Sequence, residues 1–105
     1  MAKKPEYNYK SLQTEYGKMP PQAVDLEEAI LGSLMLEKDA FITVSDFLKP
    51  ECFYKEAHQK IYRGIQNLSL NNEPVDILTV SEEMKRLGEL EEIGGYYYLA
   101  QLTSK

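Results

Sequence analysis

YKEAHQKIYRGIQNLSL, residues 54–70, is the stretch that decides the fold class of this 105-residue chain. Its apolar side chains recur at Tyr54, Ala57, Ile61, Ile65 and Leu68. Side chains spaced three and four residues apart lie on one face of an α-helix, and charged or amide side chains fill most of the remaining positions. The stretch therefore predicts an amphipathic helix from Tyr54 or Lys55 to about Leu70, with its apolar face in the core.

Upstream, DLEEAILGSLML (residues 25–36) predicts a helix that is buried around most of its circumference. Its apolar stripe consists of Leu26, Ile30, Leu31, Leu34 and Met35. Asp25 and Glu28 have the spacing of a capping box, so this helix should begin near Asp25. Gly32 lies in mid-helix, where glycine costs about 1 kcal/mol relative to alanine, and the expected compensation is the close approach of another helix.

A shorter helix is expected over residues 40–48. It should end before Pro50, because the residue that precedes a proline avoids helical geometry. Residues 51–53 should then form a turn, with Cys52 and Phe53 directed into the core.

Downstream of residue 70, the sequence predicts a turn over residues 71–74 and then another helix. Thr79 and Glu82 match the capping box S/T-x-x-E, so this helix is expected over residues 81–87. Its buried stripe is expected to comprise Val80, Met84 and Leu87. Gly88 should stop the helix at the C′ position.

The last helix is expected after Gly94-Gly95, following one short turn at residues 90–93. Tyr98 and Leu102 lie four residues apart and should share its buried face, with Leu99 beside them.

No window alternates polar and apolar residues for long enough to indicate a strand. The sequence therefore predicts an all-α domain over residues 19–105, a compact bundle of five or six short helices. Residues 1–18 show neither helical nor alternating periodicity, and we expect them to form a flexible, disordered tail.

Composition narrows the class of protein. Apolar residues make up 43% of the chain and charged residues 28%, as in soluble globular domains. The longest apolar run, AILGSLML, is too short to cross a bilayer, and the N-terminus lacks the apolar region of a signal peptide. We therefore expect a cytoplasmic location and no membrane association.

The formal net charge is −5, and residues 19–105 alone carry −7. An acidic domain repels the phosphate backbone, so we expect weak or no direct DNA binding.

No motif indicates catalysis or metal binding. Gly94-Gly95 lacks the G-x-x-x-x-G-K-[ST] pattern of a phosphate-binding loop, so we interpret the pair as a tight turn. His58 is the only histidine, and a lone helical histidine is more often a hydrogen-bonded packing residue. The glutamate pairs are interpreted as solvated or helix-start charges: Glu27-Glu28, Glu82-Glu83 and Glu91-Glu92. We expect no catalytic residue and no metal ligand.

Tyr96, Tyr97 and Tyr98 are consecutive, and consecutive helical positions point about 100° apart. At least one of the three rings must therefore be exposed. Exposed tyrosine is enriched at protein interfaces, which makes these rings candidates for partner binding alongside Asp25.

Five segments of the sequence, taken in order, resemble a known family. They are PPQ (20–22), DLEEAILGSLML (25–36), LKPECFYKEAHQKIY (48–62), EPVDILTVSEEMKRLGELEEIGG (73–95) and YYLAQL (97–102). Together they resemble the N-terminal domain of DnaB-type replicative DNA helicases over residues 19–105.

The resemblance implies a role in DNA replication. In that family, copies assemble as hexameric rings whose helical heads pair into dimers and form a collar. The collar contacts DnaG-type primase and, in some systems, a loader protein. ATP and Mg²⁺ are expected only in a C-terminal RecA-like domain, where the parent protein would unwind DNA in the bacterial cytosol, associated with the nucleoid. This chain contains no Walker A or B motif and should not hydrolyse ATP.

The family positions that this sequence matches are mostly structural. Core positions are matched by Leu26, Ile30, Leu34, Phe53, His58, Ile61, Val80, Leu87, Leu99 and Leu102. The resemblance further implies structural roles for Gly32, Gly94 and Gly95. Asp76 and Thr79 match a VD-x-x-T element, in which Asp76 caps the approach to the fourth helix. The aromatic residue after Gly-Gly is matched by Tyr98, on a surface expected to face primase or the neighbouring head.

Besides the interpretation of this chain as a fragment of a helicase, two other interpretations remain. A stand-alone helical adaptor that binds replication proteins would have the same fold, and a Walker A motif further along the gene would exclude it. A small hydrolytic enzyme would rely on His58 with nearby carboxylates.

Overall fold

The computed structural model describes residues 23–104, and the expected tail at residues 1–18 lies outside them. The helices, in chain order, are α2 (Val24–Leu36), α3 (Ala40–Val44), the 3-10 turn η2 (Pro50–Cys52), α4 (Glu56–Leu70), α5 (Ile77–Arg86) and α6 (Gly95–Thr103). Between residues 23 and 104 there is no strand, so the predicted all-α fold is confirmed. None of the described helices is long and apolar enough to cross a membrane.

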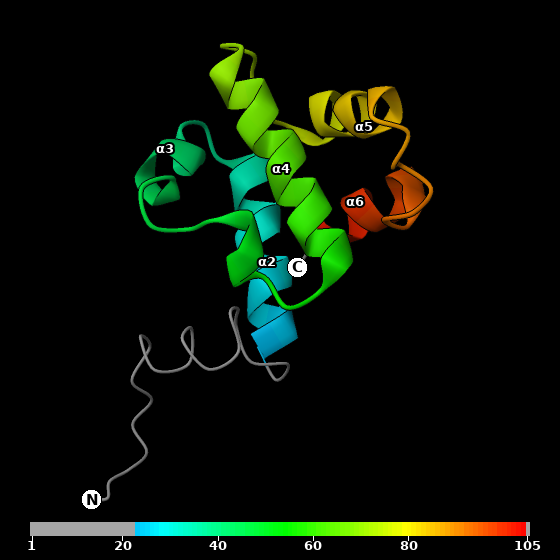
Figure 1. Cartoon of the computed structure of the whole chain (residues 1–105), viewed down its shortest axis with the longest axis horizontal. Helices are drawn as coiled ribbons and strands as arrows, with labels where there is room; N and C mark the ends of the chain where they lie inside the picture. Colours follow the sequence, from blue (N-terminus) through cyan, green and yellow to red (C-terminus); the bar gives the residue numbers. More distant parts are fainter. Residues whose placement is uncertain (1–22, 105) are drawn as a thin grey trace, which may run out of the picture.

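Helix α4 crosses over α2, with α3 on one side of the pair and α5 and α6 on the other (Figure 1). Helix α6 also packs against α2, and α5 packs against α4 and α6. The buried apolar side chains form one core: Leu31, Leu34, Met35, Leu48, Cys52, Phe53, Ile61, Tyr62, Ile65, Leu68, Val80, Met84, Ile93, Leu99 and Leu102. This core joins three segments that are distant in the sequence, residues 31–35, 48–68 and 80–102.

Helix α4 ends at Leu70, as the apolar spacing predicts, and begins at Glu56. Tyr54 precedes the helix and is 42% exposed, so its assignment to the buried helical face is wrong. The reason is that its backbone N–H donates to the side chain of Glu27, which holds the segment before α4 in an extended conformation.

Helix α2 begins at Val24, and the capping box predicted for Asp25 and Glu28 is wrong, because no side chain caps this end. Leu26 is also wrongly assigned to the core, since its side chain is 55% exposed. The buried face instead runs through Glu27, Leu31, Gly32, Leu34 and Met35. Neighbouring helical positions differ by about 100°, so burial of Glu27 turns Leu26 toward solvent.

The close approach expected at Gly32 is made by helix α6. A Cβ at this position would lie 2.1 Å from the carbonyl oxygen of Leu102. Real Cβ atoms do not come so close to a backbone atom, so only glycine fits at the α2–α6 crossing.

Helix α3 spans five residues, not the nine predicted. Its C-cap is Ser45, and the chain then turns to bring Leu48 into the core. The hydroxyl of Tyr62 donates to the carbonyl oxygen of Leu48 at 2.6 Å. This bond ties the end of the segment after α3 to helix α4.

Helix α5 begins at Ile77, four residues before the predicted start at residue 81. Its N-cap is Asp76, and the capping box is reciprocal with Thr79. The Thr79 N–H donates to Asp76 Oδ1 at 2.8 Å, and the Asp76 N–H donates to Thr79 Oγ1 at 2.9 Å. The prediction was wrong because it took Thr79 as the first member of the box, whereas Thr79 is the second.

The C-terminal end of α5 lies where Gly88 predicts it. Gly88 has a φ of +75°, and the Glu89 N–H donates to the Met84 carbonyl at 2.9 Å. This is the Schellman arrangement that glycine permits. Leu87, the C-cap, is 38% exposed, so its predicted place in the buried stripe is wrong.

Helix α6 begins at Gly95, with Gly94 as its N-cap. Both glycines have positive φ, +112° for Gly94 and +76° for Gly95. A Cβ on Gly94 would also lie 2.7 Å from that of Tyr98. The pair therefore lets the chain turn sharply into α6 and bring the Tyr98 ring against the preceding turn.

Candidate functional site

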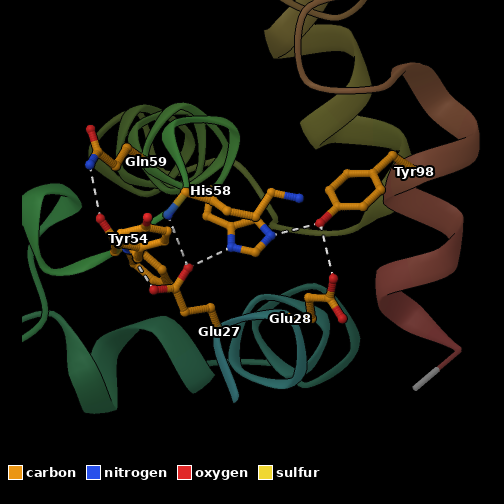
Figure 2. Close-up of polar contacts among 8 residues, drawn as sticks. Glu27, Glu28, Tyr54, His58, Gln59 and Tyr98 are labelled. Atoms are coloured by element: carbon orange, nitrogen blue, oxygen red, sulfur yellow. Dashed lines mark hydrogen bonds and ion pairs between the residues drawn. The ribbon is translucent and has the colours of Figure 1, made fainter. Parts of the chain in front are cut away.

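A polar network at the centre of the domain is formed by Glu27 and Glu28 of α2, His58 of α4 and Tyr98 of α6 (Figure 2). We call these four side chains the buried network. Glu27 and His58 are fully buried, whereas Glu28 and Tyr98 are half-buried. The network therefore connects the three helices that pack at the centre of the domain.

Three donors converge on the Glu27 carboxylate. The Tyr54 N–H donates to Oε2 at 2.6 Å, and the Lys55 N–H donates to Oε1 at 3.4 Å. The third partner is His58, whose Nδ1 lies 2.7 Å from Oε1. Because Lys55 is the N-cap of α4, the carboxylate of one helix satisfies backbone donors at the start of another.

The other ring nitrogen of His58 meets Tyr98. His58 Nε2 lies 2.7 Å from Tyr98 Oη, and Tyr98 Oη lies 3.3 Å from Glu28 Oε2. A carboxylate can only accept, so His58 Nδ1 must donate to Glu27. In the neutral ring Nε2 is then an acceptor, and the single Tyr98 O–H hydrogen faces two acceptors, His58 Nε2 and Glu28 Oε2.

Burial lowers the pKa of His58 below 6.5, and its hydrogen bond and charge interaction with Glu27 oppose that shift. Lys55 lowers the His58 pKa further, whereas Glu28 raises it. Burial also raises the pKa of the Tyr98 hydroxyl, and the negative charge of Glu28 raises it more. Both shifts favour a neutral ring and a neutral phenol at pH 7.

Aromatic packing holds the His58 ring in place. The rings of His58 and Tyr98 stack at a centroid separation of 6.0 Å, and Phe53 meets His58 edge-on at 6.3 Å. The Lys55 Nζ lies 5.2 Å from the centroid of Tyr98, within the range of a cation–π contact. His58 therefore has a partner at each ring nitrogen and an aromatic neighbour in Phe53.

The order carboxylate, imidazole, hydroxyl is that of a nucleophilic triad, but its surroundings do not suit catalysis. The His58 ring is fully buried, so a substrate cannot contact it directly. A phenol whose pKa is raised by burial is also a poorer source of a nucleophile. The network acts as a structural connection between α2, α4 and α6.

The residues predicted to bind partners occupy different environments. Tyr96 is 50% and Tyr97 73% exposed, whereas Tyr98 is drawn inward by its bond to His58. Asp25 is exposed in the first turn of α2. The structure thus brings Tyr98 together with His58 and leaves the other two rings at the surface.

The residues predicted to be structural are mostly in or against the core. Fully or nearly fully buried are Leu34, Phe53, His58, Ile61, Val80, Leu99 and Leu102. Ile30 is partly buried, and Leu26 and Leu87 are the exceptions described above.

Sequence reasoning missed Glu27, which it treated as solvated. A signal was present, because Glu27 lies four and seven residues before Leu31 and Leu34, on the face that those leucines share. A carboxylate on an apolar face requires buried donors. Among residues 23–104, no three His, Cys, Asp or Glu side chains are grouped so as to hold a metal ion.

The model of the DnaB-like helicase N-terminal domain family matches residues 19–105. The chain belongs to this family. The family resemblance predicted from the sequence is therefore confirmed, and residues 19–105 constitute an N-terminal domain of the DnaB replicative helicase type.

Relatives of this DnaB-type domain support the assignment. The replicative DNA helicase DnaB of Rhodothermus marinus is 45% identical over 95 residues, which cover 90% of this chain and 10% of that protein. The replicative DNA helicase DnaB of Geobacillus stearothermophilus is 42% identical over 86 residues, which cover 82% of this chain and 19% of that protein. The chain thus spans a small fraction of the length of these relatives.

A solved DnaB structure has the same fold. The crystal structure of the N-terminal domain of DnaB helicase from Mycobacterium tuberculosis matches with a TM-score of 0.77 and 43% sequence identity. The match covers 82% of this chain and 60% of that one.

Proposed function

We propose that this DnaB-type domain is the non-catalytic head of a replicative DNA helicase. Its role would be ring and collar assembly and the binding of primase or loader proteins. The family match over residues 19–105 is the observation that carries the proposal. In this role two heads pair as a dimer, and six copies of a longer parent protein form a ring.

The chemistry of unwinding would belong to another part of the parent protein. A C-terminal RecA-like domain would bind ATP and Mg²⁺ and supply strand separation. The head would contribute contacts between proteins in the bacterial cytosol, at the nucleoid. The acidic charge of residues 19–105 supports a protein partner over direct contact with DNA.

The proposed contact surface is the start of α6. Tyr96 and Tyr97 are large and exposed, and tyrosine contributes broad contact area with little loss of side-chain entropy. Lys60 of α4 pairs with Glu92, which supports the turn that precedes these rings. Asp25 and the partly exposed Tyr98 are proposed as secondary contacts.

The test is calorimetric titration of a DnaG-type primase C-terminal domain into the 105-residue chain and into the hexamer of the longer parent. Binding to the hexamer is expected to be the tighter, because several heads act together. The absence of binding even to the hexamer would refute the primase role.

A double variant, Tyr96→Ser with Tyr97→Ser, tests the surface. We expect at least a tenfold loss of affinity, because aromatic residues commonly contribute more than about 1.4 kcal/mol at the centre of an interface. Leu70→Ser is the matched control, since Leu70 is 80% exposed at the C-terminal end of α4 and should leave affinity unchanged. Equal losses in both variants would refute the assignment of the surface to α6.

A further inference from the structure

We propose that the exposed face of α2 is a self-pairing surface, on which a second copy of this chain packs with its own α2 antiparallel. The inference rests on the proposed function, in which two heads pair, and it names the surface that they use. Only three of the thirteen residues of α2 are charged, Asp25, Glu27 and Glu28, and Glu27 is fully buried. A helix that is apolar around most of its circumference is typically covered on all sides.

One side of α2 is nevertheless left uncovered by the helices that pack on it, chiefly α6, α4 and α3 (Figure 1). The exposed positions are three and four residues apart and form a stripe about 15 Å long: Leu26, Ala29, Ser33 and Leu36. Leu26 is 55% and Leu36 63% exposed, and no member of the stripe is charged. An exposed apolar stripe of this kind indicates a contact surface for another protein.

The order of side-chain sizes along the stripe is the same from either end. Leu26 and Leu36 each lie five residues from position 31, and the small residues Ala29 and Ser33 each lie two residues from it. A two-fold axis at position 31 therefore brings the small residues of two antiparallel helices together, where they let the helices approach closely. The same axis places Leu26 of each copy level with Leu36 of the other. The stripe is thus self-complementary, as an interface between identical chains requires.

A hollow between α2 and α3 lies beside the stripe. It is lined on α2 by Leu26, Ala29, Ile30, Ser33 and Leu34, and on α3 by Ala40, Thr43 and Val44. Because Leu26 lies on the hollow's side of the stripe, the two-fold axis keeps the second copy's Leu26 on that side, level with residue 36. The second copy's leucine therefore comes over the end of the hollow, so that apolar surface is buried twice, once for each copy.

Charge lies only at the two ends of the stripe, with Asp25 at one end and Glu37, Lys38 and Asp39 at the other. Lys38 comes near the second copy's Asp25, but Glu37 and Asp39 oppose that attraction, and residues 19–105 carry −7 in each copy. Burial of apolar surface must therefore supply the energy of pairing. Added salt screens the repulsion and should strengthen the dimer, whereas binding of a basic partner would weaken with salt.

The size of the stripe sets the strength of the pairing. A stripe about 15 Å long on a helix about 10 Å across is well short of the roughly 800 Å² per partner that stable complexes bury. The isolated chain should therefore dimerise weakly and only at high concentration. Pairing should be tighter where copies are held together in a larger assembly, because the effective concentration is then high.

Sedimentation velocity of the 105-residue chain over a range of concentrations, in low and high salt, tests the proposal. Leu26→Glu should weaken the dimer at least tenfold. Leu78→Glu is the matched control, since Leu78 lies in the first turn of α5, is 60% exposed and gains the same charge. Circular dichroism verifies that both variants are folded. Equal effects of the two variants, or a dimer that weakens with salt, would overturn the proposal.

Cross-linking tests the antiparallel arrangement. Ser33→Cys lies next to the two-fold axis and should give a covalent dimer with a short bismaleimide, because the natural Cys52 is buried. Ser104→Cys, exposed at the end of α6, should not. Failure of Ser33→Cys to cross-link, or a chain that stays monomeric at every concentration, overturns pairing through α2. The calorimetric titration with the primase domain still decides the partner-binding role in either case.

Discussion

Glu27 is buried although its neighbours in the sequence, Asp25, Leu26 and Glu28, have substantial contact with solvent. Burial of a carboxylate is costly unless donors replace the lost water. Here two backbone N–H groups and the His58 ring provide those donors. The interaction joins residues 27 and 58, so it contributes to tertiary structure rather than to the stability of either helix alone.

Glu27→Gln should lower the free energy of unfolding by about 1–3 kcal/mol, because the amide replaces one acceptor oxygen by a donor facing other donors. Urea denaturation followed by circular dichroism measures the change. Glu82→Gln, at an exposed site, should stay within about 0.5 kcal/mol of the wild type. If both variants lose the same stability, net charge and not the buried contact is responsible.

The titration of His58 predicts how stability depends on pH. Burial lowers the His58 pKa in the folded state below the unfolded value of 6.5, so the unfolded chain binds the proton more readily. Stability should be complete above pH 6.5 and should fall as the pH drops from 6.5 toward the folded-state pKa. Urea midpoints measured between pH 7.5 and pH 5.5 provide the test.

His58→Gln is the control for this pH dependence, and its stability should vary less across the same window, whatever its absolute value. Greater stability of the wild type at pH 5.5 than at pH 7.5 would contradict the prediction. Such a result would mean that the folded state prefers the charged ring.

At the scale of elements, two crossings determine how the helices pack. Helix α6 approaches α2 at Gly32, and α4 approaches α5 at Gly64, where a Cβ would lie 2.8 Å from Met84 Sδ. The obstacle at Gly32 is a backbone carbonyl, whereas at Gly64 it is part of a flexible side chain. The α2–α6 crossing should therefore tolerate substitution less well.

Gly32→Ala should destabilise the domain by about 1–3 kcal/mol, because the added methyl group forces α2 and α6 apart. This loss outweighs the gain in helix propensity, which is about 1 kcal/mol. Chemical denaturation measures the difference. Ser33→Ala, on the exposed face of the same helix, should be neutral or slightly stabilising. A stabilised Gly32→Ala variant would show that the crossing relaxes without cost.

At the scale of the whole molecule, stability should be uneven. Helix α3 has five residues and buries none of them, whereas α4 buries six and contacts η2, α5 and α2. Segments with few buried contacts open locally at low free-energy cost.

Amide hydrogen exchange should therefore be faster in α3 than in α4, with the slowest amides in α4 requiring global unfolding. Mass spectrometry of exchanged peptides resolves the two helices. Equal protection of α3 and α4 would mean that α3 opens only with the whole domain.

Local pattern was sufficient for much of the fold. The apolar spacing of residues 54–70 predicted α4 to within one or two residues, and Gly88 predicted the end of α5. These features depend on neighbours within one or two turns, so the sequence contains the whole signal. The beginning of α5 was misplaced because Asp76 and Thr79 both suit a cap, and local pattern does not rank overlapping caps.

The sequence by itself determined an all-α domain, its membership of the DnaB N-terminal family and the place of most helices. Tertiary structure alone decided the exposure of Leu26 and the contacts that Glu27, His58 and Tyr98 make with one another. The physical reason is the range of the interactions. Helical periodicity acts over three or four residues, whereas the buried network joins residues 31 to 70 positions apart.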